Sequence, residues 1–210
     1  MVATAPSSEL ILSPDADVDT PALVVSEEIL HRNIAEMASF ARSVGVNLRP
    51  HIKTHKTPQI ARLQMAAGAV GVTCAKVGEA EVMVEQAGVG DVLLAYPTIG
   101  EHKYRRIVAL MERARIVVAL DSLEAAAMAR HDRTVDVVVE VNTGQNRSGV
   151  RVGAEAVRFA LAVARLPNLD LVGIMTHEGH VNSMDLETIE AAALEAGRAM
   201  VETAEEIRAH

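Results

Sequence analysis

Short apolar runs rich in β-branched residues alternate with helical patterns along the whole chain. Several of these runs are apolar almost throughout, which is typical of parallel strands covered on both faces. Strict β/α alternation predicts parallel strands with right-handed crossovers, either closed into a barrel or laid out as an open, doubly wound sheet. The expected strands are residues 22–25, 46–52, 69–74, 91–95, 115–120, 135–141 and 169–175.

Start and stop signals for helices lie in the intervals between these runs. Ser26 is a predicted N-cap, and Thr57-Pro58 begins a helix that Gly68 ends. The other expected helices are residues 78–86, 123–130 and 154–165, and a long Ala/Glu-rich segment from residue 186 onward.

The pattern favours a barrel over a dinucleotide-binding sheet, because no Gly-x-Gly-x-x-Gly segment follows any expected strand. A complete (β/α)8 barrel needs about 250 residues. This chain has 210 residues, and its last helix is followed by no expected strand. We therefore expect an α/β fold of the TIM type, a (β/α)8 barrel that is truncated before its last strands.

The composition narrows the class of protein. The chain has 28 acidic and 20 basic side chains, a net charge of −8 and 2% aromatic residues. This balance argues against nucleic-acid binding, which requires a basic face and stacking rings. The single cysteine is typical of a protein in a reducing compartment. No apolar run approaches the ~20 residues that a membrane-spanning helix needs. Residues 1–21 lack the pattern of a secretory signal. We expect a cytoplasmic protein with neither nucleic-acid nor membrane partners.

The most reactive cluster follows the expected strand 46–52. Lys53 lies there among His51, His55, Arg49 and Lys56. In α/β folds, ligands bind at the C-terminal edge of the strands. An amine surrounded by cations releases its proton more readily, and a neutral amine can bond covalently to a carbonyl compound. The alternative is a basic surface turn, which the acidic balance of the rest of the chain makes less attractive.

Two further polar loops follow expected strands. Residues 142–149 include two glycines, Gln145 and Arg147, so the loop can present backbone N–H groups and a guanidinium to an anion or a phenolate oxygen. His177 and His180 flank a carboxylate after strand 169–175 and are candidates for acid–base work or metal binding. The alternatives are an ordinary turn and a structural pair of histidines, and a metal site would need a third ligand.

The expected topology brings these loops together, because every strand of a parallel barrel ends at the same mouth. Lys53, Arg147, His177 and His180 are therefore expected to converge although they are distant in the sequence. Tyr96 follows the strand 91–95 and is expected at the same edge.

Five segments of the chain resemble those of a known family. The chain is similar to the fold-type III pyridoxal-phosphate enzymes, which have an alanine-racemase-like barrel, and specifically to the branch of D-threonine aldolases and D-serine dehydratases. The Arg-Pro-His-x-Lys-Thr-His segment at 49–55 is specific to that branch. The matching segments are residues 19–23, 49–56, 75–81, 143–150 and 178–180, which span nearly the whole chain in the family's order.

The resemblance implies roles for individual residues. Lys53 matches the lysine that binds pyridoxal phosphate covalently, and Arg147 matches the arginine that faces the cofactor's phenolic oxygen. Residues 1–26 would be an N-terminal segment with a strand of an accessory β-domain, and residues 27–210 an incomplete barrel with six of the eight strands. The candidate catalytic residues are Lys53, His177 and His180, and the candidate cofactor-binding residues are Lys53, Arg147, Tyr96 and Gln145.

Two positions depart from the branch pattern. His177 stands where the branch usually has tyrosine, and Asn142 stands where it often has aspartate. In this family the residues for the cofactor's phosphate and pyridine nitrogen, and a divalent-metal site in a C-terminal β-domain, are encoded further along the chain. We expect pyridoxal phosphate as the cofactor, no metal site formed by the residues present, and a homodimer for the full-length protein.

Three functions fit the resemblance. The first is a lyase on small D-configured β-hydroxy amino acids, either an aldolase or a dehydratase, of which this chain is an N-terminal fragment. The second is an amino-acid racemase, and the third is a non-catalytic pyridoxal-phosphate carrier in cofactor homeostasis. The Arg-Pro-His-x-Lys-Thr-His segment favours the lyase.

Overall fold

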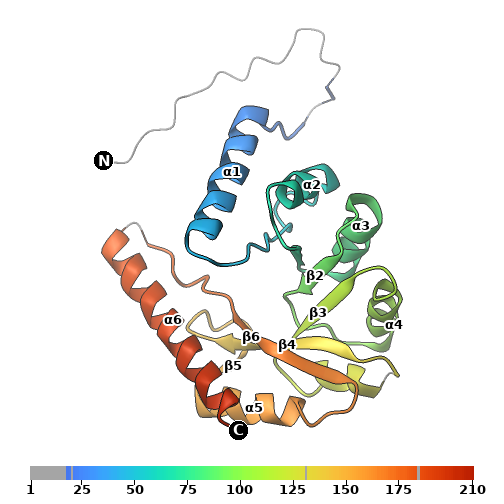
Figure 1. The fold of residues 1–210 in the computed structure, drawn as a ribbon, viewed down its shortest axis with the longest axis vertical. Helices are drawn as coiled ribbons and strands as arrows, with labels where there is room; N and C mark the ends of the chain where they lie inside the picture. Colours follow the sequence, from blue (N-terminus) through green and yellow to red (C-terminus); the bar gives the residue numbers. More distant parts are fainter. Residues whose placement is uncertain (1–17, 20, 131, 184) are drawn as a thin grey trace.

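A six-stranded parallel sheet forms the centre of the computed structural model, which describes residues 18–19, 21–130, 132–183 and 185–210 (Figure 1). Strands β1 to β4 lie side by side in chain order, and β4 also pairs with β5 and β6. Every pair is parallel. The strands are β1 (Val72–Cys74), β2 (Asp91–Leu94), β3 (Arg115–Leu120), β4 (Val135–Asn142), β5 (Val150–Arg151) and β6 (Leu169–Thr176).

Chain-order pairing, with a helical segment after most strands, is the arrangement of a β/α barrel wall. The expected strands at 69–74, 91–95, 115–120, 135–141 and 169–175 are confirmed as β1, β2, β3, β4 and β6. The register between β4 and β6 shifts once, between Val137 and Val138.

The expected strand 46–52 forms an extended segment along the outer edge of β1. Val70 N donates to Leu48 O (2.9 Å), and Thr73 N donates to Pro50 O (2.7 Å). Ile52 N donates in turn to Thr73 O (2.9 Å), which continues the parallel order of the sheet. Because Pro50 has no N–H to donate, the ladder is interrupted and only one isolated bridge is formed.

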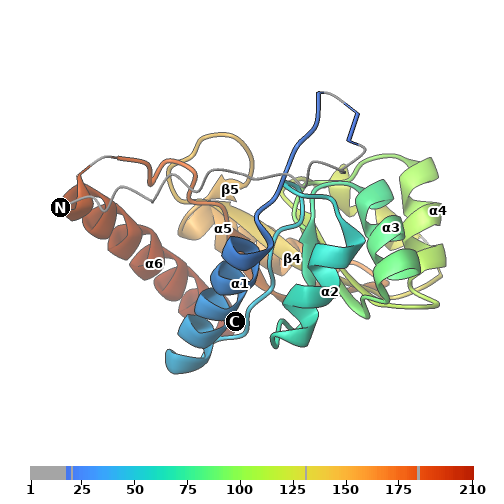
Figure 2. The ribbon, with the colours of Figure 1, turned by 90° about the horizontal axis from the view of Figure 1, so that it is seen from above.

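Helices cover the sheet, and Figure 2 shows α2, α3 and α4 side by side. The sequence signals predict two helix starts well, since Ser26 caps α1 and Pro58 begins α2, and Gly88 ends α3 in the left-handed conformation. The helices are α1 (Glu27–Ser43), α2 (Pro58–Ala66), α3 (Val77–Ala87), α4 (Glu101–Leu110), α5 (Ala154–Val163) and α6 (Leu186–Arg208).

Some elements differ from the expectation. Residues 22–25 form no strand, and Leu23 is fully exposed, because no described strand lies beside this run to pair with it. Residues 123–130 form a 3₁₀ helix, η1 (Ala125–Arg130), instead of an α-helix. The helix α4 and the two-residue strand β5 have no counterpart among the expected elements.

The expected N-terminal accessory segment falls largely on residues 1–17, which lie outside the described residues. Its assignment to a separate β-domain therefore stays a prediction. Across the described ranges, no helix combines the length and the hydropathy that crossing a bilayer requires.

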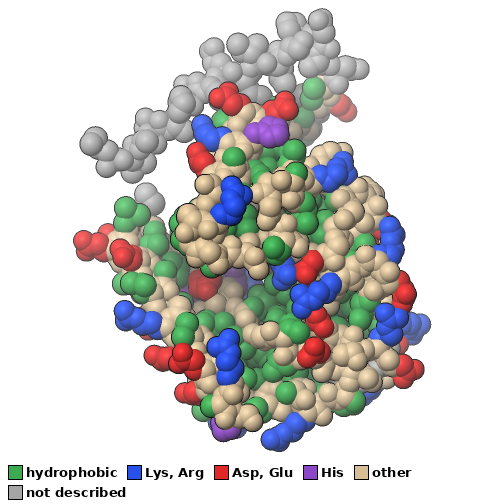
Figure 3. All heavy atoms as spheres, viewed as in Figure 1, with side chains coloured by type: hydrophobic (Ala, Val, Ile, Leu, Met, Phe, Trp, Pro, Cys, Tyr) green, Lys and Arg blue, Asp and Glu red, His purple; other side chains and the backbone are tan. Residues whose placement is uncertain are grey.

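The core lies between the sheet and the helices and is made mainly of valine, alanine, leucine and isoleucine. Valines from four neighbouring strands are inaccessible to solvent or nearly so, for example Val72, Val92, Val118 and Val137. On the face shown in Figure 3, charged side chains of both signs are spread over the surface and hydrophobic side chains are exposed between them. One charged side chain of the core, Glu140, bears on the site described next.

Candidate active site

Lys53 lies on the turn that follows the extended segment 46–52. Its backbone N–H donates to His51 Nδ1 (3.2 Å), and Lys56 N closes the turn on Ile52 O (2.8 Å). Lys56 adopts a positive φ of 48°, an uncommon conformation for a non-glycine residue. Lys53 is exposed to solvent in this turn, at the C-terminal end of the extended segment 46–52.

The loop 142–149 holds Arg147 after β4. Asn142 Oδ1 accepts hydrogen bonds from Gly144 N (3.0 Å) and Asn146 N (3.1 Å), which folds the chain tightly at the start of the loop. Ser148 and Gly149, at the end of the loop, are tied to carboxylates below them. Arg147 is exposed between this anchored end and the turn formed at Asn142.

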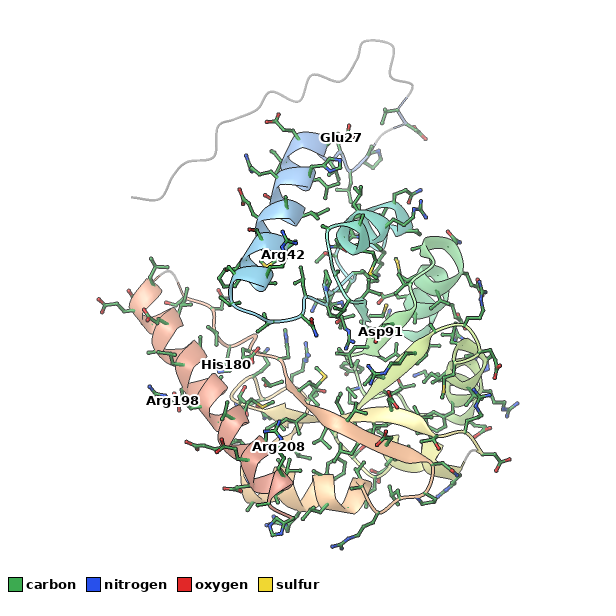
Figure 4. The ribbon with its side chains drawn as sticks, in the orientation of Figure 1. Glu27, Arg42, Asp91, His180, Arg198 and Arg208 are labelled. Carbon is green, nitrogen blue, oxygen red and sulfur yellow. The ribbon has the colours of Figure 1, made fainter. Side chains whose placement is uncertain are left out.

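The loop after β6 packs against the loop 142–149. Thr143 Oγ1 and Thr176 Oγ1 share a hydrogen bond of 2.8 Å. A Cβ placed on Gly144 would lie 2.6 Å from His180 Nε2, and one placed on Gly179 would lie 2.8 Å from the Oε1 of Gln145. The two loops therefore interlock, with His180 and Gln145 at their contact. Figure 4 marks His180 in the segment between β6 and α6.

Charge interactions connect these loops to Lys53. Burial lowers the pKa of His177, and the positive charges of Arg147 and Lys53 lower it further. Burial likewise lowers the pKa of His51, as does the positive charge of Lys53. The structure thus brings Lys53, Arg147 and His177 to one mouth, together with His51, and both imidazoles are neutral at pH 7.

Tyr96 is placed less decisively. It follows β2 at the expected edge, the residue is 52% exposed, and its backbone carbonyl accepts a hydrogen bond from Thr98 Oγ1 (3.3 Å). Within the described residues, the structure gives no hydrogen bond between the Tyr96 side chain and Lys53 or Arg147.

Three groups at the mouth were not among the candidate residues. His51 shapes the Lys53 turn, and Glu140 and Asp121 lie beneath the Arg147 loop. Glu140 carried a signal in the sequence, because acidic residues are rarely buried and it lies within the largely apolar run 135–141, whose other carboxylate, Asp136, is near its start. Asp121 directly follows β3, where a polar residue can reach the mouth. In the part of the chain that the structure describes, no three His, Cys, Asp or Glu side chains form a metal-binding group.

A family model described as the alanine racemase N-terminal domain matches residues 25–210. The chain belongs to this family. Its relatives within the alanine racemase N-terminal domain family are fold-type III pyridoxal-phosphate enzymes, and the expected barrel of this type is confirmed.

Three relatives in this family illustrate the match. The 3-hydroxy-D-aspartate aldolase of Paracoccus denitrificans is 32% identical over 197 residues, which cover 90% of this chain and 51% of the relative. The D-threo-3-hydroxyaspartate dehydratase of Delftia sp. is 35% identical over 202 residues, covering 91% and 52%. The crystal structure of D-threonine aldolase from Filomicrobium marinum has a TM-score of 0.86 and 42% identity, covering 91% and 53%. The chain spans about half the length of these relatives.

Proposed function

We propose that this chain is the cofactor-binding barrel of a pyridoxal-phosphate-dependent lyase that acts on small D-configured β-hydroxy amino acids. The reaction is either aldol cleavage or dehydration, since the relatives are named as enzymes of both kinds. The observation that carries the proposal is the convergence of Lys53, Arg147 and His177 at one end of the sheet in a chain of this family.

The residues at the mouth fit pyridoxal phosphate. Lys53 offers an exposed amine for covalent attachment to an aldehyde, and Arg147 offers a charged donor for a phenolic oxygen. The two neutral imidazoles beside them add hydrogen-bonding capacity without further positive charge. Bound pyridoxal phosphate supplies an electron sink for breaking a bond at the carbon that bears the substrate's amino group.

His177 is the best placed of the proposed acid–base residues. Because its pKa is lowered, its imidazole is uncharged at pH 7 and can accept a proton from a substrate hydroxyl or carbon. His180 lies against Gly144 at the edge of the same mouth. Lys53 would hold the cofactor's aldehyde covalently, and its amine, when free, would serve as a second base.

Covalent trapping tests the role of Lys53. The chain should take up pyridoxal phosphate, and borohydride reduction followed by peptide mass spectrometry should locate the label on Lys53. Lys53→Ala should abolish labelling, whereas Lys56→Ala and Lys76→Ala should label like the unmodified chain. Label found on Lys56 or Lys76 in its place would refute the assignment.

Product analysis tests the reaction, and the full-length protein is the right sample because the chain spans half of its relatives. With D-threonine, D-serine and 3-hydroxy-D-aspartate, an aldolase releases an aldehyde and glycine, whereas a dehydratase releases a keto acid and ammonia. Formation of the L-isomer alone would show that the protein is a racemase and not a lyase. Cofactor binding without any product would show that it is a non-catalytic carrier of the cofactor.

We also propose that the full-length protein is a homodimer, as the resemblance implies. Light scattering coupled to size-exclusion chromatography measures its mass directly. A monomeric full-length protein would contradict this part of the proposal.

A further inference from the structure

A buried carboxylate lies directly beneath the Arg147 loop. Glu140 is near the end of β4, and its residue is only 2% exposed. Ser148 Oγ donates to Glu140 Oε1 (2.8 Å), whereas within the described residues Oε2 is buried and has no hydrogen-bond partner. Burial raises the pKa of Glu140 and the negative charge of Asp121 raises it too, whereas the Ser148 hydrogen bond and the Arg147 charge lower it. Leaving a buried carboxylate oxygen unpaired costs free energy, so its retention calls for a reason.

The surroundings of Glu140 supply that reason. Glu140, Gln145, Arg147 and His177 line one small cleft at the mouth. Glu140 and Arg147 therefore line the same small hollow, and their charges attract each other.

The anchors of the loop also converge below Arg147. Ser148 is held by Glu140 from β4, and Gly149 N donates to Asp121 Oδ2 (3.3 Å) at the end of β3. The two residues directly after Arg147 are therefore fixed by carboxylates from two neighbouring strands. A shift of this anchor would move the guanidinium.

We propose that Glu140 is the positioning residue of Arg147: its Oε1 fixes the loop through Ser148, and its Oε2 accepts a hydrogen bond from the guanidinium when an anionic ligand fills the mouth. The assignment of that ligand as pyridoxal phosphate rests on the proposed function. The positioning of Arg147 itself is a property of this chain alone.

Glu140→Gln is the informative variant. It keeps the side-chain volume and an acceptor for Ser148, but it removes the charge and replaces one oxygen by an N–H₂ group that cannot accept. Thr203→Val is the matched control, because Thr203 is equally buried, accepts a hydrogen bond from Gly153 N (3.2 Å) and lies on α6. Both variants lose a buried polar function, and only the first touches the mouth.

The readout is the mobility of the Arg147 Nε–H group, measured by ¹⁵N NMR and assigned through its disappearance in Arg147→Lys. Glu140→Gln should increase this mobility when pyridoxal phosphate is bound, because the second acceptor oxygen is lost, and should weaken cofactor binding about tenfold, the loss expected for one charge-assisted hydrogen bond. Ser148→Ala, which removes the loop anchor, should increase the mobility with and without the cofactor. Adding Glu140→Gln to Arg147→Lys should change the cofactor's absorbance no further. Thr203→Val should lower the melting temperature and leave the Arg147 signal unchanged.

Unchanged Arg147 mobility in Glu140→Gln, with only a lower melting temperature, would overturn the inference and make Glu140 a structural residue. If Glu140→Gln does not fold, Ser148→Ala removes the loop anchor and should also mobilise Arg147, and an unaffected Arg147 would again overturn it. If the unmodified full-length protein does not take up pyridoxal phosphate, the proposed function fails, but comparing Ser148→Ala with the unmodified protein without ligand still decides whether the anchor between Glu140 and Ser148 holds Arg147.

Discussion

Arg147 is exposed at the mouth, and its planar guanidinium can donate in a geometry that lysine cannot reproduce. Arg147→Lys should therefore shift the absorption of the cofactor-loaded protein and weaken cofactor binding. Because the side chain is exposed, the free energy of unfolding should change by less than about 0.5 kcal/mol. Spectral titration and urea unfolding measure the two effects. A large loss of stability with an unchanged spectrum would mean that the residue is structural.

Gly144 adopts a positive φ of 142° and lies against His180. Gly144→Ala would force an added methyl group into the His180 ring in a backbone conformation that alanine avoids. We expect a loss of roughly 1–3 kcal/mol in the free energy of unfolding and a displaced His180 NMR signal. Gly90→Ala is the control, since nothing lies within 4 Å of its added Cβ and its φ is not positive. Equal behaviour of the two variants would rule out the contact between the loops.

Among the site residues, the sequence predicted the positions of those that belong to a motif at the end of an expected strand. Lys53, Arg147 and His177 each follow a strand position, so their common edge could be predicted from topology alone. The contact of His180 with Gly144 could not be predicted, because it depends on the detailed conformation of two irregular loops. The role of Glu140 was missed because the sequence does not show which of the two carboxylates of β4, Asp136 and Glu140, is buried beneath the Arg147 loop.

Asp91 is the first residue of β2, so it stands at the end of the strand opposite the mouth, and it is labelled in Figure 4. Arg49 Nη2 lies 2.6 Å from its Oδ1, without the geometry of a hydrogen bond, and Arg115 Nη1 lies 3.3 Å from its Oδ2. Arg115 also pairs with Asp136 on β4. One carboxylate at the start of β2 therefore connects the extended segment 46–52 with β3.

Asp91→Asn should lower the free energy of unfolding by about 1–2 kcal/mol, because its carboxylate is partly shielded from water, Arg49 loses its ion pair and Arg115 keeps only Asp136. Urea unfolding measures the change. Glu85→Gln is the control, since its pair with Arg113 is longer (3.9 Å) and both side chains are exposed. A control variant that is destabilised as much as Asp91→Asn would show that the connection between strands is not the cause.

At the element scale, long periodic segments were predictable and short or interrupted ones were not. The apolar strands β3, β4 and β6 match their expected ranges within a residue. The run 46–52 was placed correctly, but Pro50 cannot donate to the ladder and limits it to isolated hydrogen bonds. The first turns of α4 are mostly polar and charged, which masks the buried stripe of Tyr104, Ile107 and Leu110.

The stability of the whole molecule should fall as the pH falls from 7.5 to 5.5. Burial lowers the pKa of His51, His55 and His177 below 6.5, so the unfolded chain binds more protons than the folded chain in this range. Glu140 acts in the opposite direction, because its raised pKa lets the folded state hold a proton above pH 4.5. Three histidines against one carboxyl give a net loss.

Urea unfolding at pH 7.5, 6.5 and 5.5 measures this dependence. Replacing His55 by glutamine, away from the mouth, should flatten the curve by removing one of the three contributions. A free energy of unfolding that is constant or rises towards pH 5.5 would contradict the balance of these four groups.

The strands lie in chain order, so Lys53 and His177 come from the first and the last positions of the described wall. They can approach each other only after the strands between them have paired, and such distant contacts form late because chain closure is costly. During folding, the lysine turn and its bridge to β1 can form early from local contacts. The cluster of Lys53, Arg147 and His177 is assembled only when β6 joins β4. The ability to hold a ligand at the mouth is thus acquired at the end of folding, which makes ligand uptake a reporter of the completed sheet.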